Sequence, residues 1–230
     1  MLIIFDLDGV LIDSEPLAAE AMSTVLGSFG HDVSPKDIMH TCTGLSLKDI
    51  LAKLEKRLAK VLPAEVAEGI WPATRKLFAN RLAPMPGVIP FLQELPWSHC
   101  VASSSLPEGI RFSLEVTGLL PHFEERYFSS SQVARGKPAP DLFLHAARTM
   151  HVEPRKCVVI EDSIAGVTAA TAAGMHVIGF AGGGHVAPGH VERLKAAGAI
   201  TVVDHWSMMP AVLGTVTGIM PEDHVEGEGR

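Results

Sequence analysis

The chain has 230 residues, a length that suits one domain with a modest insertion, and 47% of them are hydrophobic, which is enough for a substantial core. It carries 19 Lys and Arg against 26 Asp and Glu, and the resulting net charge of −7 argues against nucleic-acid and anionic-membrane partners. Three cysteines are too few for a disulfide framework, and neither a signal-peptide pattern nor an apolar stretch of about 18 residues is present, so we expect a cytoplasmic protein.

Short apolar runs recur along the chain, each ending in small or acidic residues and followed by a segment of helical length. Continuous apolar runs are typical of strands that are buried on both faces. Their alternation with helices predicts an α/β fold with a mainly parallel, Rossmann-like sheet. The runs lie at 2–5, 99–102, 127–128, 157–160, 177–180 and 200–203. The clearest predicted helices between them span 138–150 and 163–173.

One segment, 14–84, interrupts this alternation after the first apolar run. It contains no strand-like run, and we expect its core to be a series of apolar residues at helical spacing. The series is Leu47, Ile50, Leu51, Leu54, Leu58 and Val61. Ser46 and Asp49 are typical of a capping box at a helix start. The sequence therefore predicts an all-helical insertion at 14–84 between two parts of one α/β core, 1–13 and 85–230, with a frayed end at 218–230.

Polar residues that could carry chemistry follow several of the predicted strands. In a parallel sheet the ligand crevice lies beyond the carboxyl ends of the strands, so residues at these positions should meet. They are Asp6 and Asp8 after the first run, three serines at 103–105 after the second, Lys137 in the loop before 138–150, and Glu161 and Asp162 after 157–160. We expect the three serines to cap a helix whose N-terminus binds an anion.

Four carboxylates at one edge of the sheet would not all remain ionised without a compensating cation. A hard divalent ion such as Mg²⁺ prefers a few carboxylates together with substrate phosphate oxygens. With a lysine and a hydroxyl nearby, such a site holds the parts needed for phosphoryl transfer. In contrast, the eleven histidines show no metal-ligand spacing, and 182–185 is typical of a flexible connection, so we expect His185 and His190 to be loop residues.

Four motifs carry a family resemblance. The strings FDLDGVLIDSEP, VASSS, GKPAPD and VIEDSIAG begin at Phe5, Val101, Gly136 and Val159. In this order and spacing they resemble the haloacid dehalogenase superfamily of phosphohydrolases, in the branch of β-phosphoglucomutase and the sugar-phosphate phosphatases. The resemblance covers nearly the whole chain and implies a Rossmann-like core with the family's small helical cap at 14–84. The stretch 128–179 is also similar to phosphatases of 6-phosphogluconate.

The resemblance implies a role for each motif residue. Asp6 would be the nucleophile that forms an aspartyl phosphate, and Asp8 would protonate the leaving alcohol and then activate water. Ser103 and the N–H of Ser104 would bind the phosphoryl oxygens, and Lys137 would offset their negative charge. Members of the superfamily that cleave carbon–halogen bonds lack the second aspartate of the first motif, so Asp8 argues against that activity.

The resemblance also implies one Mg²⁺ ion and a set of cap residues near the substrate. The expected metal-binding residues are Asp6, Asp8, Glu161 and Asp162, with Glu161 binding either directly or through water. The cap residues expected to contact the leaving group are Glu15, Gly44, Ser46 and Lys48.

The leading hypothesis is a Mg²⁺-dependent phosphatase of a small phosphorylated metabolite, either a sugar phosphate or a sugar-acid phosphate. The alternative is a mutase of the β-phosphoglucomutase type, which carries a histidine where this chain has Ala18 and an arginine near Leu47; the absence of both favours hydrolysis. A catalytically silent binding protein would lack Asp6, Asp8 or Lys137, and all three are present. We expect a monomer, because the cap already shields the site.

Overall fold

The computed structural model describes residues 1–42 and 45–218, and within them it forms a six-stranded parallel sheet with the strand order β3-β2-β1-β4-β5-β6. The strands are β1 (Leu2–Phe5), β2 (Ser98–Ser103), β3 (Tyr127–Ser129), β4 (Cys157–Glu161), β5 (His176–Phe180) and β6 (Thr201–Val203). Each predicted apolar run coincides with one of these strands to within one residue at either end. The predicted α/β fold with a parallel sheet is therefore confirmed.

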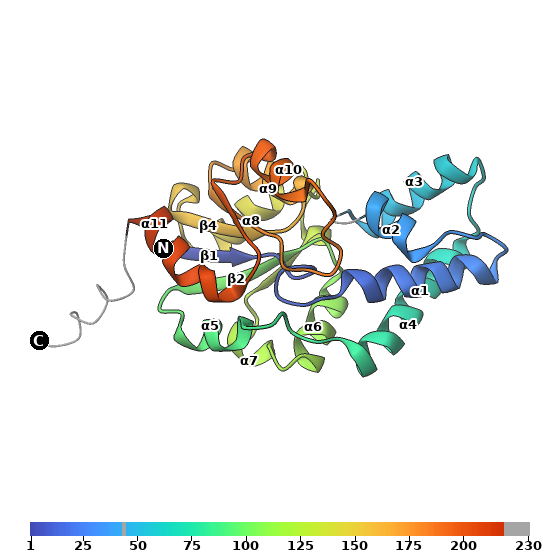
Figure 1. The fold of residues 1–230 in the computed structure, drawn as a ribbon, viewed down its shortest axis with the longest axis horizontal. Helices are drawn as coiled ribbons and strands as arrows, with labels where there is room; N and C mark the ends of the chain where they lie inside the picture. The colour runs from blue at the N-terminus through green and yellow to red at the C-terminus, as the bar shows by residue number, and fades with distance from the viewer. Residues whose placement is uncertain (43–44, 219–230) are drawn as a thin grey trace, which may run out of the picture.

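Helices cover both faces of this sheet, as Figure 1 shows. On one face lie α5 (Val88–Glu94), α6 (Pro107–Val116), α7 (Leu120–Phe123) and α11 (Met209–Thr217); on the other lie α8 (Asp141–Thr149), α9 (Ile164–Ala172) and α10 (His190–Ala197). Successive side chains of β1 alternate between the faces. Ile3 and Phe5 enter the first cluster with Trp206, and Leu2 and Ile4 enter the second. Because both faces are covered, β1 is a continuous apolar run.

A helical insertion separates β1 from α5. In the described residues it consists of α1 (Glu15–Ser28), α2 (Pro35–Cys42), α3 (Leu47–Leu58) and α4 (Ala64–Arg81). These helices bury an apolar cluster of their own, which includes Leu26, Leu54 and Val66. The two connections to the core run side by side, since the N–H of Asp13 donates to the carbonyl of Ala83 at 3.3 Å. In Figure 1 the insertion lies beyond the edge of the sheet at which β1 ends.

Two local predictions in the insertion have different outcomes. Ser46 does cap α3, because its Oγ accepts a hydrogen bond from the N–H of Asp49 at 3.3 Å and donates to Asp49 Oδ2 at 2.6 Å. The prediction that the apolar series forms the core is wrong at both ends, since Leu47 is 36% exposed and Val61 is 87% exposed. Val61 lies outside the helix because α3 ends at Leu58 and Ala59 adopts a left-handed conformation (φ 51°), which turns the chain away.

The remaining elements are short. Three 3₁₀ helices, Ser130–Gln132, Pro154–Lys156 and Trp206–Met208, occur among the described residues. Gly218 ends α11 in a left-handed conformation (φ 66°), and residues 219–230, where we predicted a frayed end, lie outside the described residues. Within the described part of the chain, no helix combines the length and the apolar character that crossing a membrane requires.

Candidate active site

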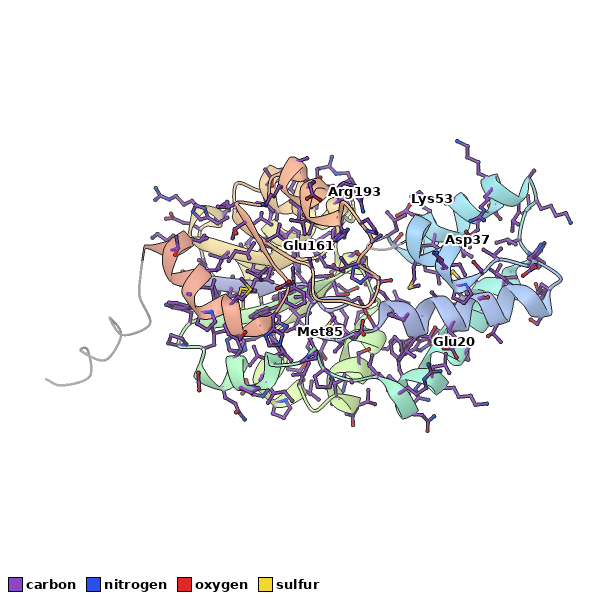
Figure 2. The ribbon with its side chains drawn as sticks, in the orientation of Figure 1. Glu20, Asp37, Lys53, Met85, Glu161 and Arg193 are labelled. Atoms are coloured by element: carbon purple, nitrogen blue, oxygen red, sulfur yellow. The ribbon has the colours of Figure 1, made fainter. Side chains whose placement is uncertain are left out.

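The carboxyl ends of β1, β2 and β4 meet at one edge of the sheet, because the strands are parallel and in register. Phe5 of β1 is aligned with Val101 of β2 and with Ile160 of β4. The N–H of Asp6 continues this pairing by donating to the carbonyl of Ile160 at 3.0 Å. Asp6 and Glu161, the next residue of β4, are therefore neighbours; Figure 2 labels Glu161 in this part of the molecule.

Lys137 connects these two carboxylates. Its Nζ donates to Asp6 Oδ1 at 2.8 Å, to Glu161 Oε2 at 2.7 Å and to the carbonyl of Ala102 at 3.2 Å, so all three ammonium protons have acceptors. The side chain of Lys137 is only 2% exposed. Burial alone would lower the pKa of Lys137, but the attraction of Asp6 and Glu161 outweighs it and raises the pKa above its ordinary value. The lysine thus provides a fixed positive charge beneath the site.

The carboxylates around this lysine are more numerous than one positive charge can balance. Asp6, Glu161 and Asp162 are all buried, and each offers an oxygen within 4.8 Å of the others. Burial, followed by the repulsion of Glu161, raises the pKa of Asp6 well above its usual range, with Lys137 opposing the shift. The pKa of Asp162 is raised for the same two reasons in the same order. The cluster therefore favours the binding of additional positive charge.

The donor set fits a hard divalent cation such as Mg²⁺. Its ligands would all be oxygens, which Mg²⁺ prefers, and Asp6, Glu161 and Asp162 each place a carboxylate oxygen within 4.8 Å of the others. Glu161 is less free to coordinate, since Oε1 accepts from the N–H and hydroxyl of Ser163 and Oε2 accepts from Lys137. Its contacts therefore favour the water-mediated option for this residue, and Asp162 is the better placed for direct binding.

Asp8 immediately precedes the turn that begins at Gly9, whose left-handed conformation (φ 79°) suits glycine. Three hydroxyls donate to its carboxylate: that of Ser14 to Oδ1 at 2.8 Å, and those of Ser105 and Ser103 to Oδ2 at 2.9 and 3.2 Å. The carboxylate is thereby held in one orientation. Sequence analysis did not anticipate the roles of Ser14 and Ser105. Ser105 is 97 positions from Asp8, and a contact over that distance has no local sequence pattern; Ser14 is only six positions away, but its contact depends on the turn at Gly9.

The prediction that the serines at 103–105 cap the following helix is wrong. The helix α6 begins later, at Pro107, and its N-cap position is Leu106, which makes no side-chain cap. The hydroxyls of Ser103 and Ser105 are instead directed to Asp8, and the carbonyl of Ser104 accepts from the hydroxyl of Ser130 at 2.9 Å. These serines therefore organise the site from the end of β2 and the bend that follows it rather than from a helix N-terminus.

The loop between β5 and α10 brings two histidines to Asp162. Nε2 of His185 lies 2.8 Å from Asp162 Oδ2, and Nε2 of His190 donates to the carbonyl of Asp162 at 2.7 Å. His190 is the first residue of α10, so the prediction that it lies in a loop is wrong, whereas His185 is a loop residue as predicted. A signal was available in their position, because the loop follows β5 and hence leaves the sheet at the same edge as Asp6.

The predicted cap residues differ in burial and in their contacts. Glu15, at the start of α1, is half-buried, and burial together with the charges of Asp162 and Asp8 raises the pKa of Glu15 to about 8. Ser46 is engaged with its own helix through the cap described above, and Lys48 is exposed. Gly44 lies outside the described residues.

Comparisons with known proteins point in one direction. The model of a family described as haloacid dehalogenase-like hydrolase matches residues 3–180. The 6-phosphogluconate phosphatase of Escherichia coli (strain K12) is 29% identical over 209 residues, which cover 90% of this chain and 92% of that protein. Hexitol phosphatase A of the same organism is 32% identical over 193 residues, which cover 76% of this chain and 80% of that protein.

A solved structure from Agrobacterium tumefaciens also matches over nearly its full length. It is a conserved haloacid dehalogenase-like protein of unknown function that is 36% identical to this chain, with a TM-score of 0.81. The match covers 93% of this chain and 97% of that one.

Proposed function

The chain belongs to the haloacid dehalogenase-like hydrolases, and on this premise we propose that it is a Mg²⁺-dependent phosphatase that hydrolyses a small phosphorylated sugar or sugar acid through an aspartyl-phosphate intermediate. Its curated relatives are phosphatases of this family, so the enzyme is a phosphoric monoester hydrolase. The observation that supports the mechanism best is the contact of buried Lys137 with both Asp6 and Glu161. A permanent positive charge at the end of β1 is what a transferring phosphoryl group requires.

The first chemical step would take place at Asp6. Its carboxylate attacks phosphorus in line with the leaving alcohol, the P–O bond to the alcohol breaks, and an acyl phosphate forms on Asp6. Lys137 is bound to Oδ1 of Asp6, so it stays beside the carboxylate as charge develops on the phosphoryl oxygens. The hydroxyl of Ser103 and the N–H of Ser104 would bind those oxygens, as the motif VASSS implies.

Asp8 would handle both protons. It protonates the alcohol oxygen as the P–O bond breaks, and it then accepts a proton from the water that attacks the acyl phosphate and restores Asp6. The hydroxyls of Ser14 and Ser105 can each donate or accept, so they can hold the Asp8 carboxyl in place in either protonation state while the hydroxyl of Ser103 turns to the phosphoryl group.

The metal would be held by Asp6, by Asp162 and by the main-chain carbonyl of Asp8, with Glu161 contributing through water or through its contact with Lys137. Bound Mg²⁺ would supply positive charge that offsets the repulsion among the carboxylates and neutralises the phosphoryl group. Asp162 would direct one oxygen to the ion. Glu161 would keep Lys137 ionised and in place.

The helical segment 14–84 would form a cap over the site and exclude water from the first step. Within it, Glu15 is the strongest candidate for a contact with the hydroxyls of a sugar, because it is half-buried beside Asp8 and Asp162. Gly44, Ser46 and Lys48 remain predictions. The similarity to a 6-phosphogluconate phosphatase makes a sugar-acid phosphate the first substrate to test.

Two further properties belong to the proposal. The buried thiols of Cys100 and Cys157 are unpaired, which suits a reducing compartment such as the cytoplasm. A cap supplied by the chain itself would shield the site without a second subunit, which supports a monomer.

The test is a kinetic screen of the purified protein with Mg²⁺ across phosphorylated hexoses, pentoses, sugar acids and nucleotides. We expect inorganic phosphate to be released fastest from a sugar or sugar-acid phosphate. Interconversion of sugar phosphates faster than phosphate release would instead favour the mutase, which Ala18 argues against. Absence of turnover on every substrate, together with no stabilisation by Mg²⁺ and beryllium fluoride, would favour the silent binding protein.

A further inference from the structure

The segment 181–190, which comprises the loop after β5 and the first residue of α10, contacts Asp162 at two points. His190, just after the loop, donates from Nε2 to the main-chain carbonyl of Asp162 at 2.7 Å. His185, within the loop, has 2% of its side chain exposed, and its Nε2 lies 2.8 Å from Asp162 Oδ2. The two imidazole rings are perpendicular, with centroids 5.8 Å apart. The segment 181–190 thus places His190 against the main chain of Asp162 and His185 against its side chain.

The contact of His185 with Asp162 brings together two buried groups that lack hydrogen-bond partners among the described residues. Both ring nitrogens of His185 and Oδ2 of Asp162 are buried, and none of the three has a hydrogen-bond partner among the described residues. Buried polar groups are rarely left unpaired. The Nε2–Oδ2 separation already suits a hydrogen bond, so a rotation of the ring that directs Nε2–H at the carboxylate completes one.

The backbone of Gly9 and Gly183 packs closely against the His185 ring. A Cβ on Gly9 would collide with the Asp162 carboxylate and lie 2.9 Å from the His185 ring, and a Cβ on Gly183 would lie 2.7 Å from that ring. Both positions therefore require glycine if the histidine is to reach the aspartate. The N–H of Gly184 donates to Asp13 Oδ1 at 3.0 Å, which fastens the loop to the chain segment that leads into α1.

We infer that His185 is a positioning residue for the metal site, which holds Oδ2 of Asp162 by a hydrogen bond and thereby keeps this carboxylate in one orientation, with its other oxygen available to the metal ion. The inference rests on the proposed function, in that Asp162 is taken to bind Mg²⁺. A carboxylate free to rotate would spend part of its time facing away from the ion, so the cost of losing His185 appears in metal affinity. Residues that orient a metal ligand in this way typically change the affinity by about 10–100-fold when they are removed.

The test measures Mg²⁺ binding in the absence of substrate, by calorimetric titration of the metal-free full chain and by the rise of its melting temperature with Mg²⁺ concentration. We expect His185→Ala to bind Mg²⁺ about tenfold more weakly or worse. His185→Gln, whose amide can donate to the same oxygen, should recover most of the affinity. His176→Ala is the matched control, because His176 is an exposed histidine at the opposite end of β5, and it should bind Mg²⁺ like the wild type.

Each outcome decides a separate point. Equal Mg²⁺ affinity in the wild type and in His185→Ala overturns the positioning role and leaves the proposed function untouched. A wild type that binds no Mg²⁺ contradicts the metal assignment itself, and the inference with it. If the alanine variant does not fold, His185→Phe replaces it, because phenylalanine fills the space of the ring without a hydrogen-bond donor. Weak Mg²⁺ binding by His185→Phe and strong binding by His185→Gln would support the inference. Equal Mg²⁺ binding by these two variants would overturn it.

Discussion

The edge of the sheet and the helical insertion hold their polar residues in opposite ways. At the edge, Lys137 is buried and all three of its protons have acceptors within the core. In the insertion, Ser46 is used by its own helix and Lys48 is exposed. The core therefore fixes its chemical groups before any substrate arrives, whereas Ser46 and Lys48 of the insertion are not held at the site. A fixed reaction combined with a variable contact surface is what allows one fold to serve many substrates.

The two regions also differ in the energetic role of charge. Buried ions are costly to remove from water, and at the edge this cost is offset only because Lys137 and its carboxylates contact each other directly. The ion pairs of the insertion, such as that of Arg81 with Glu20 at 2.7 Å, are exposed and contribute little. Substitutions at the edge should thus alter activity and stability strongly, and those of polar residues in the insertion should alter them weakly.

The largest expected effect is the loss of activity in Asp6→Asn. Without a nucleophilic carboxylate, kcat should fall by about 10³-fold or more. The metal-free variant should remain at least as stable as the wild type, because burial and Glu161 hold the pKa of Asp6 above its usual range and make its ionised form unfavourable. Phosphate release and thermal melting in the presence of a chelator measure the two quantities. Full retention of activity would eliminate Asp6 as the nucleophile.

Lys137→Met should lower stability more than any exchange of a surface lysine. It leaves Asp6 and Glu161 buried without their positive partner, which costs about 3–5 kcal/mol. The matched control is Lys48→Met in the insertion, which should change the free energy of unfolding by less than about 0.5 kcal/mol. Urea denaturation of both variants is the measurement. Similar losses in the two would remove the energetic contrast between the regions.

Leu54→Ala tests whether the insertion has a core of its own. Leu54 is 1% exposed within the apolar cluster of the insertion, so its truncation should cost about 2–5 kcal/mol. We expect amide hydrogen exchange to accelerate in α1 to α4 while protection of β1 and β4 stays unchanged. Equal loss of protection in the sheet would show that the two regions unfold as one unit.

Glu15→Gln should alter how stability depends on pH. Burial and nearby negative charges raise the pKa of Glu15 from 4.5 to about 8, so the folded metal-free protein binds this proton more tightly than the unfolded chain does. Stability is therefore expected to fall as pH rises through that interval, and the glutamine variant should lose less. At pH 8.5 in chelator, the glutamine variant should therefore melt at a higher temperature than the wild type, and the difference should shrink as the pH is lowered toward 4.5. An identical pH profile in the two proteins would contradict the raised pKa.

Ser46→Ala carries the smallest expected effect. Loss of the cap on α3 should cost about 1 kcal/mol of stability. If Ser46 serves only its own helix, KM for the best substrate should stay within about twofold of the wild type. Loss of a substrate contact worth about 1.4 kcal/mol would instead raise KM about tenfold. A larger rise of KM would show that the hydroxyl also contacts the leaving group, as the resemblance implies.

Local sequence patterns were sufficient to predict the strands of the parallel sheet, and they selected the helical insertion and the candidate chemical groups as predictions. Continuous apolar runs indicate strands because a strand buried on both faces excludes polar residues, and the carboxyl end of each run marks where polar residues return. Asp6, Asp8, Lys137, Glu161 and Asp162 stand at such positions or within short motifs. Their place in the chain is therefore enough to select them as candidates.

The tertiary structure alone decided which groups touch. The hydroxyls of Ser14 and Ser105 on Asp8, the occupation of both oxygens of Glu161, and the approach of His185 to Asp162 all depend on loop paths. Loops lack the periodicity that makes strands and helices readable, because their backbone is determined by distant packing rather than by repeating local contacts. The candidate residues of the site could therefore be selected from the sequence. Their contacts are determined only when segments more than a hundred residues apart fold together, as those of Lys137 and Asp6 do.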